Sequence, residues 1–208
     1  ERDFIMTYYG GICDTAFTVS FSNDGEVWTE PVAASYDQGQ IFRWLWLDQS
    51  GATRHARYVR LSADDAGLRL REVGFLDENG EPLPIASTTS QAVGYPALVL
   101  YDPGLLTDEQ ETVPAYPSCL NSTYFDEIYH ARTAYEQVHY DEFDSAYEWT
   151  HPPLGKTLMM IGIELFGMTP FGWRFMGTLM GVLMLPVMYL LVKQVTKRTD
   201  LSLIAMFL

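Results

Sequence analysis

Apolar and polar positions alternate over short runs in the first 92 residues, which is the pattern of half-buried β-strands. The clearest runs are Phe17–Phe21, Ala56–Leu61 and Leu68–Leu76. Turn signals follow two of them, at Asn23-Asp24-Gly25 and at Asp77-Glu78-Asn79-Gly80. Short alternating strands between polar turns predict a partial antiparallel β-sandwich over residues 1–92.

The middle of the chain changes to helical periodicity. Residues 93–120 are rich in proline and predict a linker. From Tyr124 onward, apolar residues recur every three or four positions and predict a helix that Asn121, Ser122 or Thr123 caps. A second helical run, Leu154–Met168, is too short to span a bilayer and contains Glu164, so we expect an interfacial helix within an external loop over residues 121–170.

The most apolar segment predicts a transmembrane helix. Phe171–Val192 would rise about 33 Å as an α-helix, enough to cross a hydrocarbon core of about 30 Å. The loop that follows, residues 193–200, is basic and is therefore expected to be cytoplasmic. Residues 1–170 would then lie outside the cytoplasm. Residues 201–208 would begin the next transmembrane helix, so the chain is interpreted as an internal fragment of a multi-pass protein of the cell membrane.

The charge distribution limits the range of partners. Residues 1–150 hold eight Arg, no Lys and 25 acidic residues, a net charge of −17, whereas residues 151–208 have a net charge of +3. Such an acidic first part argues against binding nucleic acid. Two cysteines, Cys13 and Cys119, favour free thiols, and a disulfide between them stays open.

Two motifs in the predicted external loop suggest chemistry. They are the acidic pair Asp126-Glu127 and the stretch His151-Pro-Pro-Leu-Gly-Lys156. Together with Arg174 at the start of the transmembrane helix, they resemble the bacterial protein O-mannosyltransferases over roughly residues 120–200. The resemblance implies the type C glycosyltransferase architecture, with many transmembrane helices and an active site at the external face. It also implies a polyprenyl-phosphate sugar, mannose first of all, as the donor.

The resemblance assigns the base, and the chemistry of the transfer suggests roles for the other residues. Asp126 would be the base in an inverting transfer to a hydroxyl, and Glu127 would support it. His130, His151, Lys156 and Arg174 would contact the donor phosphate, whose developing charge needs cationic or donor groups. The acceptor would be Ser or Thr on an exported protein, or an envelope glycan. No cofactor is expected, because the lipid-linked sugar is a substrate, and no metal, because no ligands with metal spacing appear in the sequence.

Each of these residues also has a simpler interpretation. Asp126 and Glu127 could complement the helix dipole, and Lys156 and Arg174 could anchor helix ends at the membrane surface. His130 could pair with Asp126 or Glu127 along the helix. The joint occurrence of the motifs, and no single residue, favours an enzyme.

The β-rich part resembles the discoidin, or coagulation-factor type C, module. The matching pieces are Phe17–Trp28, Ala56–Leu61 and Leu70–Phe75. The resemblance implies a carbohydrate ligand as one role for the module, although we expect Trp44 and Trp46 to be packing residues. A non-catalytic, membrane-anchored carbohydrate-binding protein is therefore the alternative function.

Overall fold

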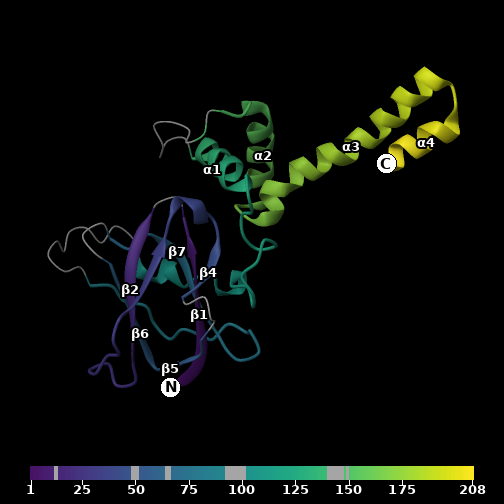
Figure 1. Cartoon of the computed structure of the whole chain (residues 1–208). Coiled ribbons are helices and arrows are strands. Elements are labelled where there is room, and N and C mark those ends of the chain that lie inside the picture. The colour runs from purple at the N-terminus through teal and green to yellow at the C-terminus, as the bar shows by residue number, and fades with distance from the viewer. Residues whose placement is uncertain (12–13, 48–51, 64–66, 92–101, 140–147, 149) are drawn as a thin grey trace. The chain divides into compact units, whose positions relative to one another are not determined.

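The computed structural model describes residues 1–208 except for 12–13, 48–51, 64–66, 92–101, 140–147 and 149. The chain forms two compact units, Glu1–Ile128 and Tyr129–Leu208. The first contains the strands and the second contains most of the helical residues (Figure 1).

Two antiparallel sheets make up most of the first unit. One sheet is built around β1 (Arg2–Gly10), which pairs with β4 (Trp44–Trp46), β5 (Arg54–Ala56) and β7 (Leu70–Leu76). In the other sheet, β2 (Thr15–Ser22) lies between β3 (Val32–Tyr36) and β6 (Tyr58–Ala63). The predicted antiparallel β-structure is confirmed.

The two sheets enclose one hydrophobic core. Alternate residues of β2 point inward, and its Phe17 and Phe21 rings meet side chains of β1. The ring centroids of Tyr8 and Phe17 are 5.2 Å apart, and those of Phe4 and Phe21 are 6.0 Å apart. The period-2 pattern of the sequence therefore identified the buried face of β2 correctly.

Both predicted turns are present and depend on glycine. Gly25 has a φ of 82° and Gly80 a φ of 78°, in the left-handed region that other residues rarely adopt. The amide of Gly80 donates to the carbonyl of Asp77 at 3.0 Å, which closes the second turn.

The described part of the predicted linker packs onto the sheets. It contains the short 3₁₀ helices η3 (Pro103–Leu106) and η4 (Gln110–Thr112), followed by the buried Val113. The Gln110 amide donates to the Glu72 carboxylate at 2.5 Å and to the Val73 carbonyl at 2.8 Å. Glu72 itself is buried, and burial raises its pKa to about 7. Residues 102–120 thus belong to the same compact unit as the strands.

The helices are α1 (Glu127–Val138), α2 (Pro153–Phe166), α3 (Pro170–Thr196) and α4 (Thr199–Phe207). In the second unit, Ala131, Ala134, Ile163 and Trp173 form a small core between α1, α2 and α3. Helix α2 begins at a Pro-Pro pair, whose fixed φ suits a first turn, and α3 begins after Thr169, whose hydroxyl accepts from the Gly172 amide at 3.1 Å.

Helix α3 is long and apolar enough to cross a membrane, by length and composition. Its 27 residues correspond to about 40 Å. Of the helices described, it alone meets this criterion. The helix contains the predicted span 171–192 and continues four residues farther, to Thr196, so the predicted loop 193–200 is mostly helical. Only Lys197 and Arg198 lie between α3 and α4.

Candidate functional site

The acidic pair lies at the start of α1, and its two carboxylates differ in their surroundings. The Glu127 carboxylate accepts a hydrogen bond from the Tyr124 amide at 3.0 Å, while the Glu127 amide donates to the Tyr124 carbonyl at 3.0 Å. Asp126 is exposed. Glu127 therefore closes the turn before the helix, and Asp126 presents its carboxylate to solvent.

The prediction that Asn121, Ser122 or Thr123 caps α1 was wrong. The Ser122 hydroxyl accepts from the Trp44 amide at 3.0 Å, and the Thr123 hydroxyl donates to the Ile41 carbonyl. The Asn121 side chain instead accepts from the Ser118 amide at 2.8 Å. Long-range partners in the first unit thus engage the Ser122 and Thr123 side chains, and a local turn engages that of Asn121.

The Lys156 side chain is almost completely buried, with 3% of the residue exposed. Its ammonium donates to the backbone carbonyl of Glu148 at 2.8 Å and also pairs with the carboxylate of the same residue. Lys156 belongs to the first turns of α2, so it ties the segment before the prolines to the helix after them.

Glu148 is a central residue that the sequence did not indicate. One carboxylate oxygen pairs with Lys156, and the other accepts from the Thr150 amide at 2.5 Å and from the His151 amide at 3.2 Å. The hydrogen bonds from Lys156 and then Thr150 hold the Glu148 pKa well below its ordinary value. Glu148 is therefore an anion at neutral pH. The signal in the sequence that could have identified Glu148 was its position three residues before His151.

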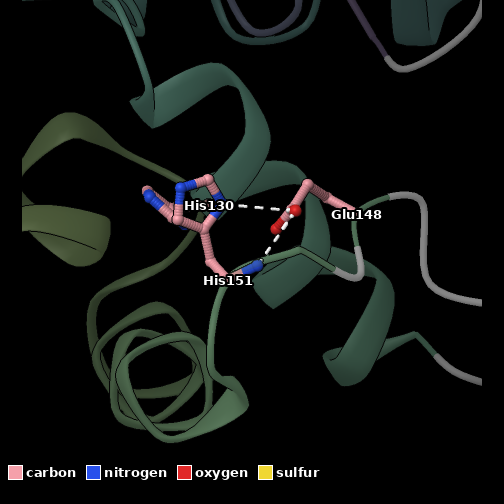
Figure 2. Close-up of side chains that lie close together, drawn as sticks. All are labelled: His130, Glu148 and His151. Carbon is pink, nitrogen blue, oxygen red and sulfur yellow. Dashed lines mark hydrogen bonds and ion pairs between the residues drawn. The ribbon is translucent and has the colours of Figure 1, made fainter.

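Two histidines meet beside this carboxylate. The rings of His130, from α1, and His151 lie with centroids 4.7 Å apart at an interplanar angle of 76°. A nitrogen of each ring and a Glu148 oxygen all lie within 4.8 Å of one another. Figure 2 shows the three side chains converging. We name His130, Glu148 and His151 the His-Glu-His cluster.

The structure thus brings together three of the predicted site residues, His130, His151 and Lys156, through Glu148. Arg174 lies in the first turns of α3, with its guanidinium carbon 5.8 Å from the centroid of the Trp173 ring. Asp126 and Glu127 belong to the first unit. Chemically, the second unit offers two imidazoles around a fixed carboxylate, and the start of α1 offers an exposed carboxylate.

The first unit also has an open cavity of about 590 Å³, which Arg43, Trp44 and Trp46 help to line. Trp44 is 7% exposed and packs against Leu76 and Val113, and Trp46 packs against the same cluster. The predicted packing role is confirmed for the buried Trp44, whereas the half-buried Trp46 both packs and lines the cavity. Cys119 is exposed, and Cys13 lies outside the described residues, so the predicted state of the two thiols stays a prediction.

Parts of the sequence are similar to two curated proteins. A stretch of 84 residues, 39% of the chain, is 37% identical to the polyprenol-phosphate-mannose–protein mannosyltransferase of Mycobacterium tuberculosis (strain CDC 1551 / Oshkosh) and covers 16% of that protein. A stretch of 92 residues, 43% of the chain, is 34% identical to the enzyme with the same name from Mycolicibacterium smegmatis (strain ATCC 700084 / mc(2)155) and covers 18% of it.

The chain spans less than a fifth of the length of these curated relatives. No protein-family model and no solved structure matches it, so the resemblance of residues 1–92 to the discoidin module stays a prediction. Over about two fifths of its length, the chain is similar to protein mannosyltransferases that use polyprenol-phosphate-mannose.

Proposed function

We propose that this chain is part of a membrane glycosyltransferase that moves a sugar, mannose in the first instance, from a polyprenyl-phosphate donor to a hydroxyl. The acceptor is Ser or Thr on an exported protein, or alternatively an envelope glycan. The observation that supports this most is the 37% identity to the mannosyltransferase. The apolar helix α3 and the exposed acidic residue at the start of α1 are consistent with it.

In this proposal Asp126 is the catalytic base. Attack by a hydroxyl requires a group that removes its proton as the new bond forms, and a carboxylate that no capping bond engages is suited to this. Attack opposite the phosphate inverts the anomeric carbon. Glu127 supports the base by holding the turn through the Tyr124 amide.

Cationic and donor side chains of the second unit would contact the donor phosphate. The side chain of His151 is 47% exposed and can reach a ligand, and His130 lies against it. The Lys156 ammonium is held by Glu148, so its direct contact with phosphate would require that pair to open. That contact and the one from Arg174 stay predictions.

We also propose the orientation in the membrane. Helix α3 crosses the bilayer, and Lys193, Lys197 and Arg198 at its end face the cytoplasm. Residues 1–170 then lie on the outer face, where a lipid-linked sugar and an exported acceptor can meet. The complete protein would be a multi-pass protein of the cell membrane.

The first unit would be an accessory module of the discoidin kind that binds a carbohydrate. The 590 Å³ cavity is the candidate place, and Arg43 supplies a donor group beside its aromatic lining. A membrane-anchored carbohydrate-binding protein without catalysis is the rival function that this cavity favours.

A sugar-transfer assay decides between the two functions. The full-length protein in detergent is supplied with radiolabelled polyprenyl-phosphate-mannose and a Ser/Thr-rich peptide. Asp126→Asn should lower turnover by a factor on the order of 10² to 10⁴ while the protein stays folded, because only the proton acceptor is lost. Asp108→Asn, at another exposed aspartate, is the matched control and should keep normal turnover. Transfer at the normal rate by Asp126→Asn excludes Asp126 as the base, and no transfer by the wild type favours the carbohydrate-binding function.

A further inference from the structure

The His-Glu-His cluster has the composition of a transition-metal site. Two imidazoles and one carboxylate are the protein ligands of one class of zinc centre, in which a fourth position stays open. Mg²⁺ and Ca²⁺ prefer oxygen ligands alone. The ligands are contributed by α1, by Glu148 and by the residue just before the Pro-Pro pair of α2, so three segments would be joined by one ion.

The geometry is close to that of a bound site. Zinc bonds of about 2.0–2.1 Å place tetrahedral ligands about 3.3 Å apart. The candidate ligand atoms here lie within 4.8 Å of one another. Rotation of side chains can close the remaining gap, because the side chain of His151 is 47% exposed and its Nδ1 already lies 3.2 Å from a Glu148 carboxylate oxygen.

Glu148 is already arranged as a ligand. Lys156 holds one carboxylate oxygen and the backbone carbonyl, so the side chain is oriented before any ion arrives. The other oxygen points to the Thr150 and His151 amides and lies on the histidine side of the carboxylate. Partners that orient a ligand in this way commonly contribute 10- to 100-fold to metal affinity.

We propose that His130, Glu148 and His151 bind one Zn²⁺ ion, with a fourth position open to water or to an anionic oxygen. Lys156 keeps its carboxylate oxygen and serves as the residue that positions Glu148. The sequence expectation of no metal rested on spacing, and intervals of 18 and three residues do not suggest a site until the segments fold together. The proposal concerns ion binding and does not depend on sugar transfer.

The test measures zinc directly. Full-length protein in detergent is stripped with a chelator and dialysed against buffered micromolar Zn²⁺, and bound metal is measured by atomic emission. His130→Gln and His151→Gln should each lower the affinity at least about tenfold, because a lost ligand should cost no less than a lost orienting partner. Co²⁺ substituted for Zn²⁺ should give the visible absorption of a four-coordinate site in the wild type and lose it in both variants.

A control variant separates specific binding from general effects. His139 directly follows the last residue of α1, the helix that carries His130, but stacks on Tyr135, with ring centroids 4.1 Å apart. His139→Gln should bind zinc as the wild type does. Circular dichroism shows whether each variant is folded, and the exposed His151 is the substitution least able to disturb packing. Equal zinc affinity in wild type and folded His151→Gln overturns the proposal, whether or not the protein transfers sugar.

Discussion

The Lys156 ammonium reaches back eight residues to bind both the backbone carbonyl and the carboxylate of Glu148. This pair is nearly buried, with 4% of the lysine side chain and 9% of the glutamate side chain exposed. Breaking a buried ion pair by removing one partner leaves an uncompensated charge, which is strongly unfavourable. The lysine of the His-Pro-Pro-Leu-Gly-Lys motif therefore fixes Glu148, three residues before His151.

Lys156→Ala should loosen the attachment of Glu148. Without the ammonium, Glu148 loses its main partner, and a glutamate-specific protease should cut after Glu148 about ten times faster in the full-length protein, because cleavage follows the opened population. Mass spectrometry identifies the cut. Lys193→Ala, which removes the same charge near the far end of α3, should leave the rate unchanged. A wild-type rate of cleavage in Lys156→Ala would mean that other contacts hold Glu148 in place.

The stability of the first unit should fall as pH rises through neutrality. Glu72 has a folded pKa of about 7 against an ordinary value of 4.5, so between these values the folded state binds more protons than the unfolded state. The stabilisation is fully present below about pH 4.5 and is lost as the pH rises through about 7. The free energy of unfolding should fall by about 3 kcal/mol over this range. Hydrogen-exchange protection of the β7 amides measures it. Glu72→Gln should flatten the pH dependence, and the exposed Glu78→Gln should not.

Close packing between α2 and α3 depends on glycine. A Cβ on Gly162 would lie 2.4 Å from the Gly172 carbonyl oxygen. This oxygen belongs to the backbone of α3, so it can move away only if the two helices repack. Gly162→Ala should therefore destabilise the second unit by about 1–3 kcal/mol, measured by thermal unfolding of the full-length protein. Gly155, on the same helix, has open space around it, and Gly155→Ala should be neutral or raise stability by up to about 1 kcal/mol. Equal effects of the two variants would contradict the tight crossing.

The Arg174 side chain should contribute to donor affinity. If its planar guanidinium holds two phosphate oxygens, Arg174→Lys should raise the KM for polyprenyl-phosphate-mannose by about tenfold, since a lysine cannot form the same paired hydrogen bonds. Arg174→Ala should be at least as severe. Arg198→Lys, at an exposed site beyond the other end of α3, is the control. An unchanged KM in both Arg174 variants would favour the alternative that Arg174 anchors the end of the helix at the membrane surface.

Cysteine labelling checks the orientation of α3. In a protein without Cys13 and Cys119, single cysteines are introduced at the exposed Ser90 and at the exposed Gln194. An impermeant thiol reagent added to intact cells should label the first position and label the second only after the membrane is opened. The reverse pattern would place the first unit in the cytoplasm and remove the basis for chemistry at the outer face.

Local patterns predicted the elements, and long-range contacts decided the site. The period-2 alternation identified β2, the glycine turns were found from their residues, and the apolar run identified α3. Glu148 was missed because its importance depends on Lys156, His130 and His151, which only folding brings near it. For the same reason Ser122 and Thr123 were misassigned as caps: partners about 80 residues away take their hydroxyls.

Thr123 has a further consequence for the proposed base. Its amide donates to the Phe42 carbonyl at 3.1 Å, its own carbonyl accepts from the Arg43 side chain at 2.9 Å, and it is completely buried. Asp126 follows three residues later, and a chain segment of that length extends no more than about 11 Å. Asp126 is therefore tethered within this distance of a buried, hydrogen-bonded residue of the β-rich unit. If Asp126 is the base, the β-rich unit would thus help to fix the position of the group that removes the proton.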